Sequence, residues 1–149
     1  MTDTSILWQI RHFVYNHFAD TTRHPSVEET ATHFNITAAE AGEYYKELDK
    51  HHAFFLDSGT LNIRMAWPFS AIPTDFKVHA NGRTYYANCA WDMLGVPALL
   101  QCDAVMDAKF TESNEPVQLE VKNGQVTNSE LLVHFPLPFS RWYDDLVFT

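Results

Sequence analysis

Cysteine, glycine and long apolar runs are all scarce in this chain. Two cysteines in 149 residues do not make a disulfide framework, so Cys89 and Cys102 are expected to be free thiols in a reducing compartment. Five glycines leave no material for a glycine-rich phosphate loop. No apolar run approaches the length that spans a bilayer, and the N-terminus lacks the basic start and small-residue cleavage site of a signal peptide. The sequence therefore predicts a cytoplasmic protein without a membrane segment.

Basic residues are also in deficit. The chain has 19 acidic side chains against 10 basic ones, which gives a formal net charge of −9 at pH 7. The average electrostatic field of such a chain repels phosphate backbones and anionic lipid surfaces. Nucleic acid is therefore not expected as a partner.

Motifs typical of metal sites are absent from the sequence. Eight histidines occur, but none has metal-site spacing, and neither an HExxH nor a CxxC pattern is present. A zinc or iron site and other resident cofactors are therefore not expected. A cysteine hydrolase would need a histidine beside Cys89 in space, and His79 or His134 could supply it from neighbouring strands. That arrangement stays open as a minor alternative.

The N-terminal part of the chain has the apolar spacing of three helices. An apolar content of 46% indicates a packed core, and residues 4–18 carry a single apolar stripe at helix spacing. Ser26 with Glu29, and Thr37 with Glu40, match capping boxes that begin a second and a third helix. Together these patterns predict a helical N-terminal lobe.

A predicted hairpin follows the third helix. Residues 53–66 read as two short strands around the turn 57–60, and three helices with a hairpin resemble a winged helix. A helix that enters the major groove needs basic side chains, whereas this third helix carries four acidic and two basic residues: Glu40, Glu43, Glu47 and Asp49 against Lys46 and Lys50. We therefore interpret residues 1–66 as a packing lobe, with a DNA-binding regulator as an alternative.

The second half of the chain reads as an α+β lobe. Residues 67–75 form a Pro-containing connector, and the period then changes to strand alternation at 76–80 and 83–86 around Asn81-Gly82, a hairpin turn. Further strands of a small, mostly antiparallel sheet are predicted at 102–110, 117–121 and 131–135, with Asn123-Gly124 as a second hairpin turn. The predicted fold class is thus α+β, with lobes at 1–66 and 76–149.

The most chemical stretch of the sequence lies between those strands. The segment Tyr85 to Leu100 is expected to form a short helix of roughly two turns that closes at Gly95 and Pro97. Cys89 and Asp92 are three residues apart, so they share a helix face and can converge on one small ligand. They are the candidate catalytic pair.

With these residues in place, the segment Phe76 to Val121 resembles the alkylmercury (organomercurial) lyase family. The specific part of the resemblance is the C-A-x-D-x-L-x-x-P-A-L pattern from Cys89 to Leu99. It implies protonolysis of carbon–mercury bonds, in which two thiolates grip mercury and an aspartate protonates the departing carbon. By this resemblance Cys89 is the first mercury-binding cysteine and Asp92 the general acid/base. Mercury, as substrate or product, is a soft metal suited to a thiolate ligand.

The sequence departs from the family pattern in two respects. A further cysteine of characterised lyases falls at Phe110, and Cys102 aligns with no family cysteine. The second catalytic cysteine of the family is expected at or just beyond Thr149, so the second lobe looks incomplete at its C-terminus. The chain continues further, another polypeptide supplies the missing part, or this member has abandoned lyase chemistry; these explanations stay open.

The sequence thus favours an organomercurial-lyase-like protein, with an inactive form included because a second thiolate is missing. A non-catalytic protein of the same fold that binds a soft metal or thiophilic ligand through Cys89 is the first alternative. The second is a regulator that uses the N-terminal lobe.

Overall fold

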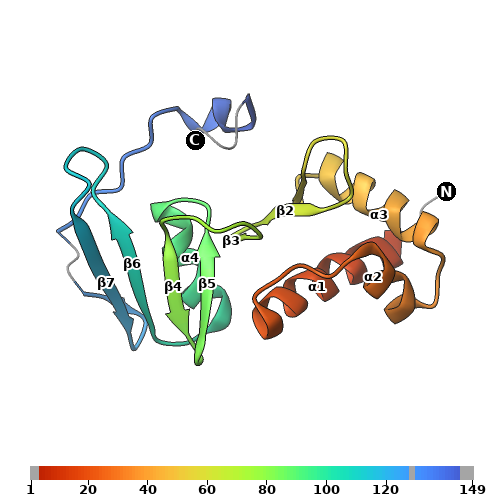
Figure 1. Cartoon of the computed structure of the whole chain (residues 1–149), viewed down its shortest axis with the longest axis horizontal. Coiled ribbons are helices and arrows are strands. Elements are labelled where there is room, and N and C mark those ends of the chain that lie inside the picture. Colours follow the sequence, from red (N-terminus) through yellow and green to blue (C-terminus); the bar gives the residue numbers. More distant parts are fainter. Residues whose placement is uncertain (1–3, 128–129, 145–149) are drawn as a thin grey trace. The chain divides into compact units, whose positions relative to one another are not determined.

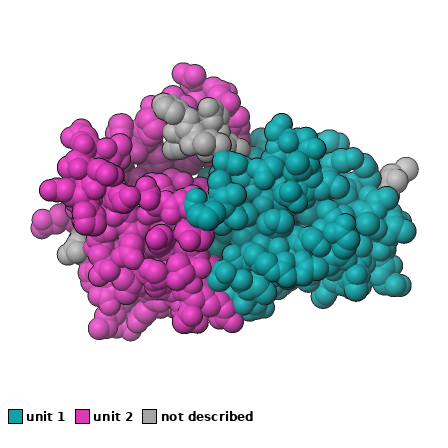
Figure 2. All heavy atoms as spheres, in the orientation of Figure 1, with its two compact units in different colours: residues 1–73 teal, residues 74–149 magenta. Residues whose placement is uncertain are grey.

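The chain forms two compact units, residues 1–73 and 74–149, which are coloured separately in Figure 2. The structure is a computed structural model that describes residues 4–127 and 130–144. Helices and strands carry the labels of Figure 1.

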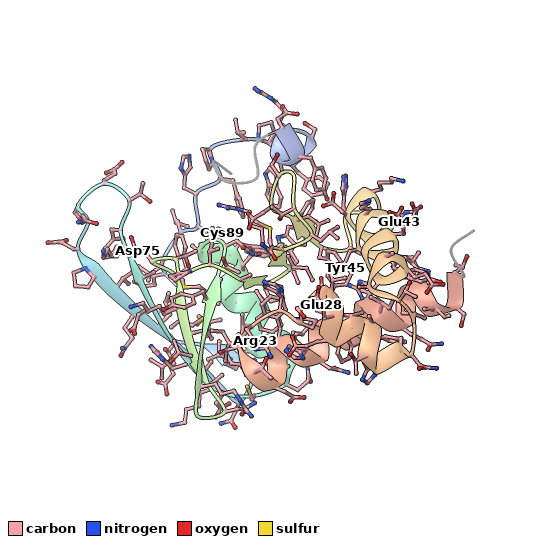
Figure 3. The ribbon with its side chains drawn as sticks, turned by 45° about the vertical axis from the view of Figure 1, so that its right-hand side comes forward. Arg23, Glu28, Glu43, Tyr45, Asp75 and Cys89 are labelled. Carbon is pink, nitrogen blue, oxygen red and sulfur yellow. The ribbon has the colours of Figure 1, made fainter. Side chains whose placement is uncertain are left out.

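Three helices form the first part of unit 1, as the sequence predicts. They are α1 (Thr4–Thr21), α2 (Val27–Phe34) and α3 (Ala38–Lys50). Four apolar residues of α1 are buried: Leu7, Ile10, Val14 and Phe18. Tyr45 and Leu48 of α3 and Phe54 of the following loop complete the core of the unit. Tyr45 points into this helical unit in Figure 3, and its hydroxyl lies 2.7 Å from the Oγ1 atom of Thr30. The helices are therefore held by burial of their apolar faces.

Both predicted capping boxes are confirmed. The Glu29 backbone N–H donates to Ser26 Oγ at 3.1 Å, and the Glu29 carboxylate accepts from the Ser26 backbone N–H at 2.8 Å. Thr37 and Glu40 repeat the arrangement at 3.2 and 2.8 Å. These bonds satisfy N–H groups that have no partner within the helix, so α2 and α3 begin at the positions predicted from the two capping boxes.

The strands of unit 1 form an antiparallel meander that is one strand longer than predicted. It contains β1 (Phe55–Leu56), β2 (Ile63–Ala66) and β3 (Phe69–Ser70). The prolines of residues 67–75 predicted a connector there. Residues 69–70 instead pair with β2, and Pro68 lies in the two-residue link between the strands, where no ladder N–H is required of it.

The exposed face of α3 is acidic. Its two lysines pair with glutamates on the same helix, with Glu43 to Lys46 at 2.7 Å and Glu47 to Lys50 at 3.0 Å. Such a face offers no excess of positive charge to a phosphate backbone, so it lends no support to the DNA-binding alternative.

Unit 2 contains a five-stranded antiparallel sheet in the order β5-β4-β6-β7-β8. The strands are β4 (Lys77–Ala80), β5 (Arg83–Ala87), β6 (Ala104–Lys109), β7 (Pro116–Lys122) and β8 (Gln125–Val126). The predicted turns Asn81-Gly82 and Asn123-Gly124 are confirmed, with positive φ angles of 50° and 72°, and of 50° and 73°. Positive φ at both central residues matches the right-handed twist of a hairpin, which is why Asn-Gly is favoured there.

A single helix, α4 (Ala90–Leu100), connects β5 to β6 and packs on one face of the sheet (Figure 1). The helix packs on β4, β5 and β6, and its residues Met93 and Val96 are buried. The buried residues of those strands include Val78, Ala80, Tyr85, Ala87 and Met106. The helix is longer than the two turns predicted, because it passes through Gly95 and Pro97 and ends at Gln101, which takes the left-handed conformation with a φ angle of 52°. Packing against the sheet thus outweighs the local preference of glycine and proline to end a helix.

The predicted strand at 131–135 is not present. Thr127 donates its backbone N–H to Glu120 O at 2.8 Å, but residues 131–135 have no strand pairing and Leu132 is 95% exposed. A 3₁₀-helix, η1 (Phe139–Asp144), follows Pro138. The apolar residues at 131–135 thus pair with no strand among the described residues, and an apolar run alone does not make a strand.

Candidate active site

Cys89 occupies the N-cap position of α4, between the end of β5 at Ala87 and the first helical residue Ala90 (Figure 3). Its backbone is extended, with φ −152° and ψ 178°, and its carbonyl accepts the first helical hydrogen bond from Met93 at 3.2 Å. The thiol makes no full capping hydrogen bond, yet the backbone N–H groups of Trp91 and Asp92 face the sulfur and favour its thiolate. The strand-to-helix junction therefore presents the sulfur to the unpaired N–H groups of the first helical turn.

Asp92 lies on the same turn and is buried, with 6% of its surface exposed. Among residues 4–127 and 130–144, the other buried polar side chains are Thr30 and Ser70, so Asp92 is the one buried group there that ionises as an acid near neutral pH. Its Oδ2 atom accepts a hydrogen bond from Asn88 Nδ2 at 3.1 Å, and its carboxyl also takes a hydrogen bond from the Cys89 thiol. A buried carboxyl with these partners is typical of a functional site.

Burial shifts both members of the pair in the same direction. Desolvation raises the pKa of Asp92 to about 6, while the hydrogen bonds from Asn88 and Cys89 oppose that shift. Desolvation, followed by the negative charge of Asp92, raises the pKa of the Cys89 thiol to about 11. At neutral pH the shared proton therefore lies on sulfur, next to a carboxylate that can accept it once the sulfur binds an electrophile.

The low polarity around the pair comes from the sheet beneath α4. Met93, one residue beyond Asp92, is 1% exposed, and Ala87 at the end of β5 is fully buried. Water is thus excluded on the sheet side of the pair, and Cys89 keeps an intermediate exposure through which a ligand can reach it. The site can therefore bind a thiophilic ligand and hold one proton beside it.

Cys102 does not join this site. It follows α4 at its other end, and 13 residues at the helical rise of about 1.5 Å separate the two cysteines by roughly 20 Å. Phe110, where the family resemblance places a further cysteine, follows β6 and is 41% exposed. The predicted position of the second catalytic cysteine, at or just beyond Thr149, lies outside the described residues.

Of the two histidines named for a hydrolase, His79 does not face Cys89. His79 alternates with the inward residues Val78 and Ala80, so it lies on the sheet face opposite α4, where it bonds Asp107 at 2.8 Å and Thr84 at 3.0 Å. His134 is exposed in the segment that forms no strand. The cysteine-hydrolase alternative therefore finds no support in His79.

No three His, Cys, Asp or Glu side chains converge on a metal position in the described parts of the chain. No helix there is long and apolar enough to cross a membrane.

Sequence reasoning missed Asn88. The sequence feature that could have identified it is its position, four residues before Asp92 and directly before Cys89. From there a polar side chain can reach forward over the first helical turn. The hydrogen bond of 3.1 Å makes it part of the candidate site.

Unit 2 is thus of the α+β class: a helix covers an antiparallel sheet, and a thiol and a buried carboxyl lie at the start of that helix. The chain belongs to the alkylmercury lyase family, whose family model matches residues 69–148, more than half of the chain. The predicted resemblance is thereby confirmed.

The solved structures agree with this assignment at the level of the fold. The crystal structure of the mercury-bound form of MerB2 is similar over 82% of this chain, with a TM-score of 0.67 and 21% sequence identity. The chain spans 58% of the length of that protein. No curated protein sequence matches the chain. The α+β fold class is confirmed by this likeness.

Proposed function

We propose that the protein binds an organomercurial through Cys89 and breaks its carbon–mercury bond by protonolysis, with Asp92 as the proton carrier. The observation that carries this proposal is the buried Asp92 carboxyl on the same helical turn as the Cys89 thiol, at the start of α4. Membership of the alkylmercury lyase family supports the same chemistry. The expected substrate is a compound with one organic group and one weakly held ligand on mercury. The Cys89 thiolate replaces the weakly held ligand, because a soft metal prefers a thiolate.

The first step is capture of the substrate. Cys89 sulfur forms a bond to mercury, a weakly held ligand leaves mercury, and the thiol proton moves to the Asp92 carboxylate. The high pKa of Cys89 does not prevent capture, because the metal displaces the proton and Asp92, with a pKa of about 6, can hold it nearby. Asp92 acts here as a general base.

The second step is protonolysis. The protonated Asp92 donates its proton to the carbon, the electron pair of the carbon–mercury bond goes to that carbon, and a hydrocarbon leaves. Mercury stays in the +2 state on the sulfur, so no oxidant or reductant is needed. Burial of Asp92 aids this step because it keeps the carboxyl protonated until the carbon accepts the proton.

Full activation needs a second thiolate on mercury, which Cys102 does not supply across the length of α4. We infer that this thiolate comes from outside the residues that the structure describes, and a small added thiol can stand in for it in an assay. A non-catalytic protein that retains a soft metal at Cys89 is the alternative function, and it needs no thiol beyond the one found among the described residues of the site. Both functions predict that mercury binds at Cys89, and only the lyase predicts hydrocarbon release.

The experiment is incubation of the protein with phenylmercury acetate and an excess of small thiol, with benzene release followed by gas chromatography. We expect release by the native chain and by Cys102→Ser, and none by Cys89→Ser. Stoichiometric mercury retention without benzene from the native chain would reject the lyase and favour the binding protein. Equal release by Cys89→Ser would reject both.

A further inference from the structure

Asn88 is placed to control the carboxyl group of Asp92. It is the single residue between the end of β5 at Ala87 and the N-cap Cys89, so the sheet and the helix both fix its backbone. Its side chain spans one helical turn, and its Nδ2 atom lies 3.1 Å from Asp92 Oδ2. The contact joins two side chains that are both at least partly withdrawn from water.

The direction of this hydrogen bond follows from the chemistry of the groups. An ionised carboxylate only accepts hydrogen bonds, so the amide of Asn88 must present its NH₂ group rather than its oxygen. A proton placed on Oδ2 would then face that NH₂ group, which is also a donor. The proton is therefore better accommodated on Oδ1, which the Asn88 bond leaves available.

We propose that Asn88 is a positioning residue that holds Oδ2 of Asp92 with its amide and so assigns proton carriage to Oδ1. As sulfur binds an electrophile, the S–H bond of Cys89 breaks and an O–H bond forms at Oδ1 of Asp92. In the return step that O–H bond breaks and the proton goes to the acceptor. Asn88 gains and loses no proton itself.

This assignment deepens the proposed function and rests on it only for the identity of the final proton acceptor. The hydrogen bond also favours the ionised form of Asp92, and its pKa falls as a result. Asn88 thus sets how readily Asp92 accepts the thiol proton, and loss of the amide should leave the carboxyl protonated over a wider pH range.

The test uses the full chain in a Cys102→Ser background, so that Cys89 is the only thiol. The Asp92 carboxyl is titrated by ¹³C NMR, with Asp92→Asn to assign its signal. We expect the titration midpoint to rise by roughly one pH unit in Asn88→Ala, because the carboxylate loses a donor. In the isosteric Asn88→Asp the midpoint should rise further, because a second carboxyl replaces the amide.

A purely structural role for Asn88 would not produce this order, because the isosteric aspartate disturbs packing less than alanine does. Unchanged midpoints in both variants, with near-UV circular dichroism like that of the parent, would overturn the proposal. So would a larger rise in Asn88→Ala than in Asn88→Asp. Asn16→Ala, an exposed position on α1, serves as the matched control and should leave the midpoint unchanged.

The titration needs no organomercurial, so its failure is distinct from failure of the proposed function. Shifted midpoints without any benzene release by the parent would keep the role of Asn88 and reject the lyase. Benzene release with midpoints that do not shift would keep the lyase and reject the role of Asn88.

Discussion

The buried Asp92 carboxyl makes the stability of the protein depend on pH. Its burial on the first turn of α4 raises the pKa from 3.8 to about 6, so the folded state binds a proton more tightly than the unfolded chain does. The contribution to stability is therefore present at low pH and is lost as the pH rises through about 6. A structural carboxylate paired with a cation behaves in the opposite way.

We therefore expect Asp92→Asn to stabilise the protein at neutral pH relative to acid pH. Between about pH 4 and about pH 7 the difference in unfolding free energy between variant and native chain should move in favour of the variant by up to roughly 3 kcal/mol. Urea denaturation at several pH values measures it. A difference that stays constant with pH would show that Asp92 titrates as an ordinary exposed carboxyl.

The Cys89 thiol should respond to the charge of its neighbour. Burial is the main reason that its pKa is about 11, and the Asp92 carboxylate is the next. In the Cys102→Ser background, Asp92→Asn should therefore lower the pH midpoint of Cys89 alkylation by iodoacetamide by roughly one pH unit. An equal or higher midpoint in Asp92→Asn would mean that the two groups do not interact.

At the scale of elements, α4 shows what the sequence could and could not predict. The Cys89–Asp92 spacing, the preceding strand and both Asn-Gly hairpins follow from local rules, and these features were predicted. The end of the helix was not, because Gly95 and Pro97 were weighed by intrinsic propensity while burial of Val96 and Pro97 keeps the helix going. The strand predicted at 131–135 was wrong because a strand forms only beside a partner strand, and the sequence does not reveal that partner.

The end of α4 offers a direct test of its backbone. Gln101 adopts a φ angle of 52°, which costs energy for any residue with a Cβ atom, and its side chain also donates to Ala98 O at 2.6 Å. Gln101→Ala loses that bond and keeps the strain, whereas Gln101→Gly loses the bond and relieves the strain. We expect the glycine variant to be more stable than the alanine variant by about 1 kcal/mol in urea denaturation. Equal stability would show that the helix does not end in the left-handed conformation.

At the scale of the whole molecule, the two cysteines belong to opposite ends of one helix and so act independently. Turnover by this chain should then depend on added thiol. We expect benzene release from phenylmercury acetate to rise with the concentration of a small dithiol and to be unaffected by Cys102→Ser, because Cys102 does not reach mercury on Cys89. Loss of release in Cys102→Ser would contradict this separation.

The measurement that bears most directly on the central claim separates capture from protonolysis at Asp92. In the Cys102→Ser background, phenylmercury is first loaded on Cys89 and the adduct is verified by mass spectrometry. Excess dithiol is then added, and benzene is followed with time for Asp92 and for Asp92→Asn. We predict that both proteins form the adduct and that only the one with Asp92 releases benzene rapidly. Equal rates of release from the two adducts would show that the proton comes from elsewhere, and would contradict the role of Asp92 as proton carrier.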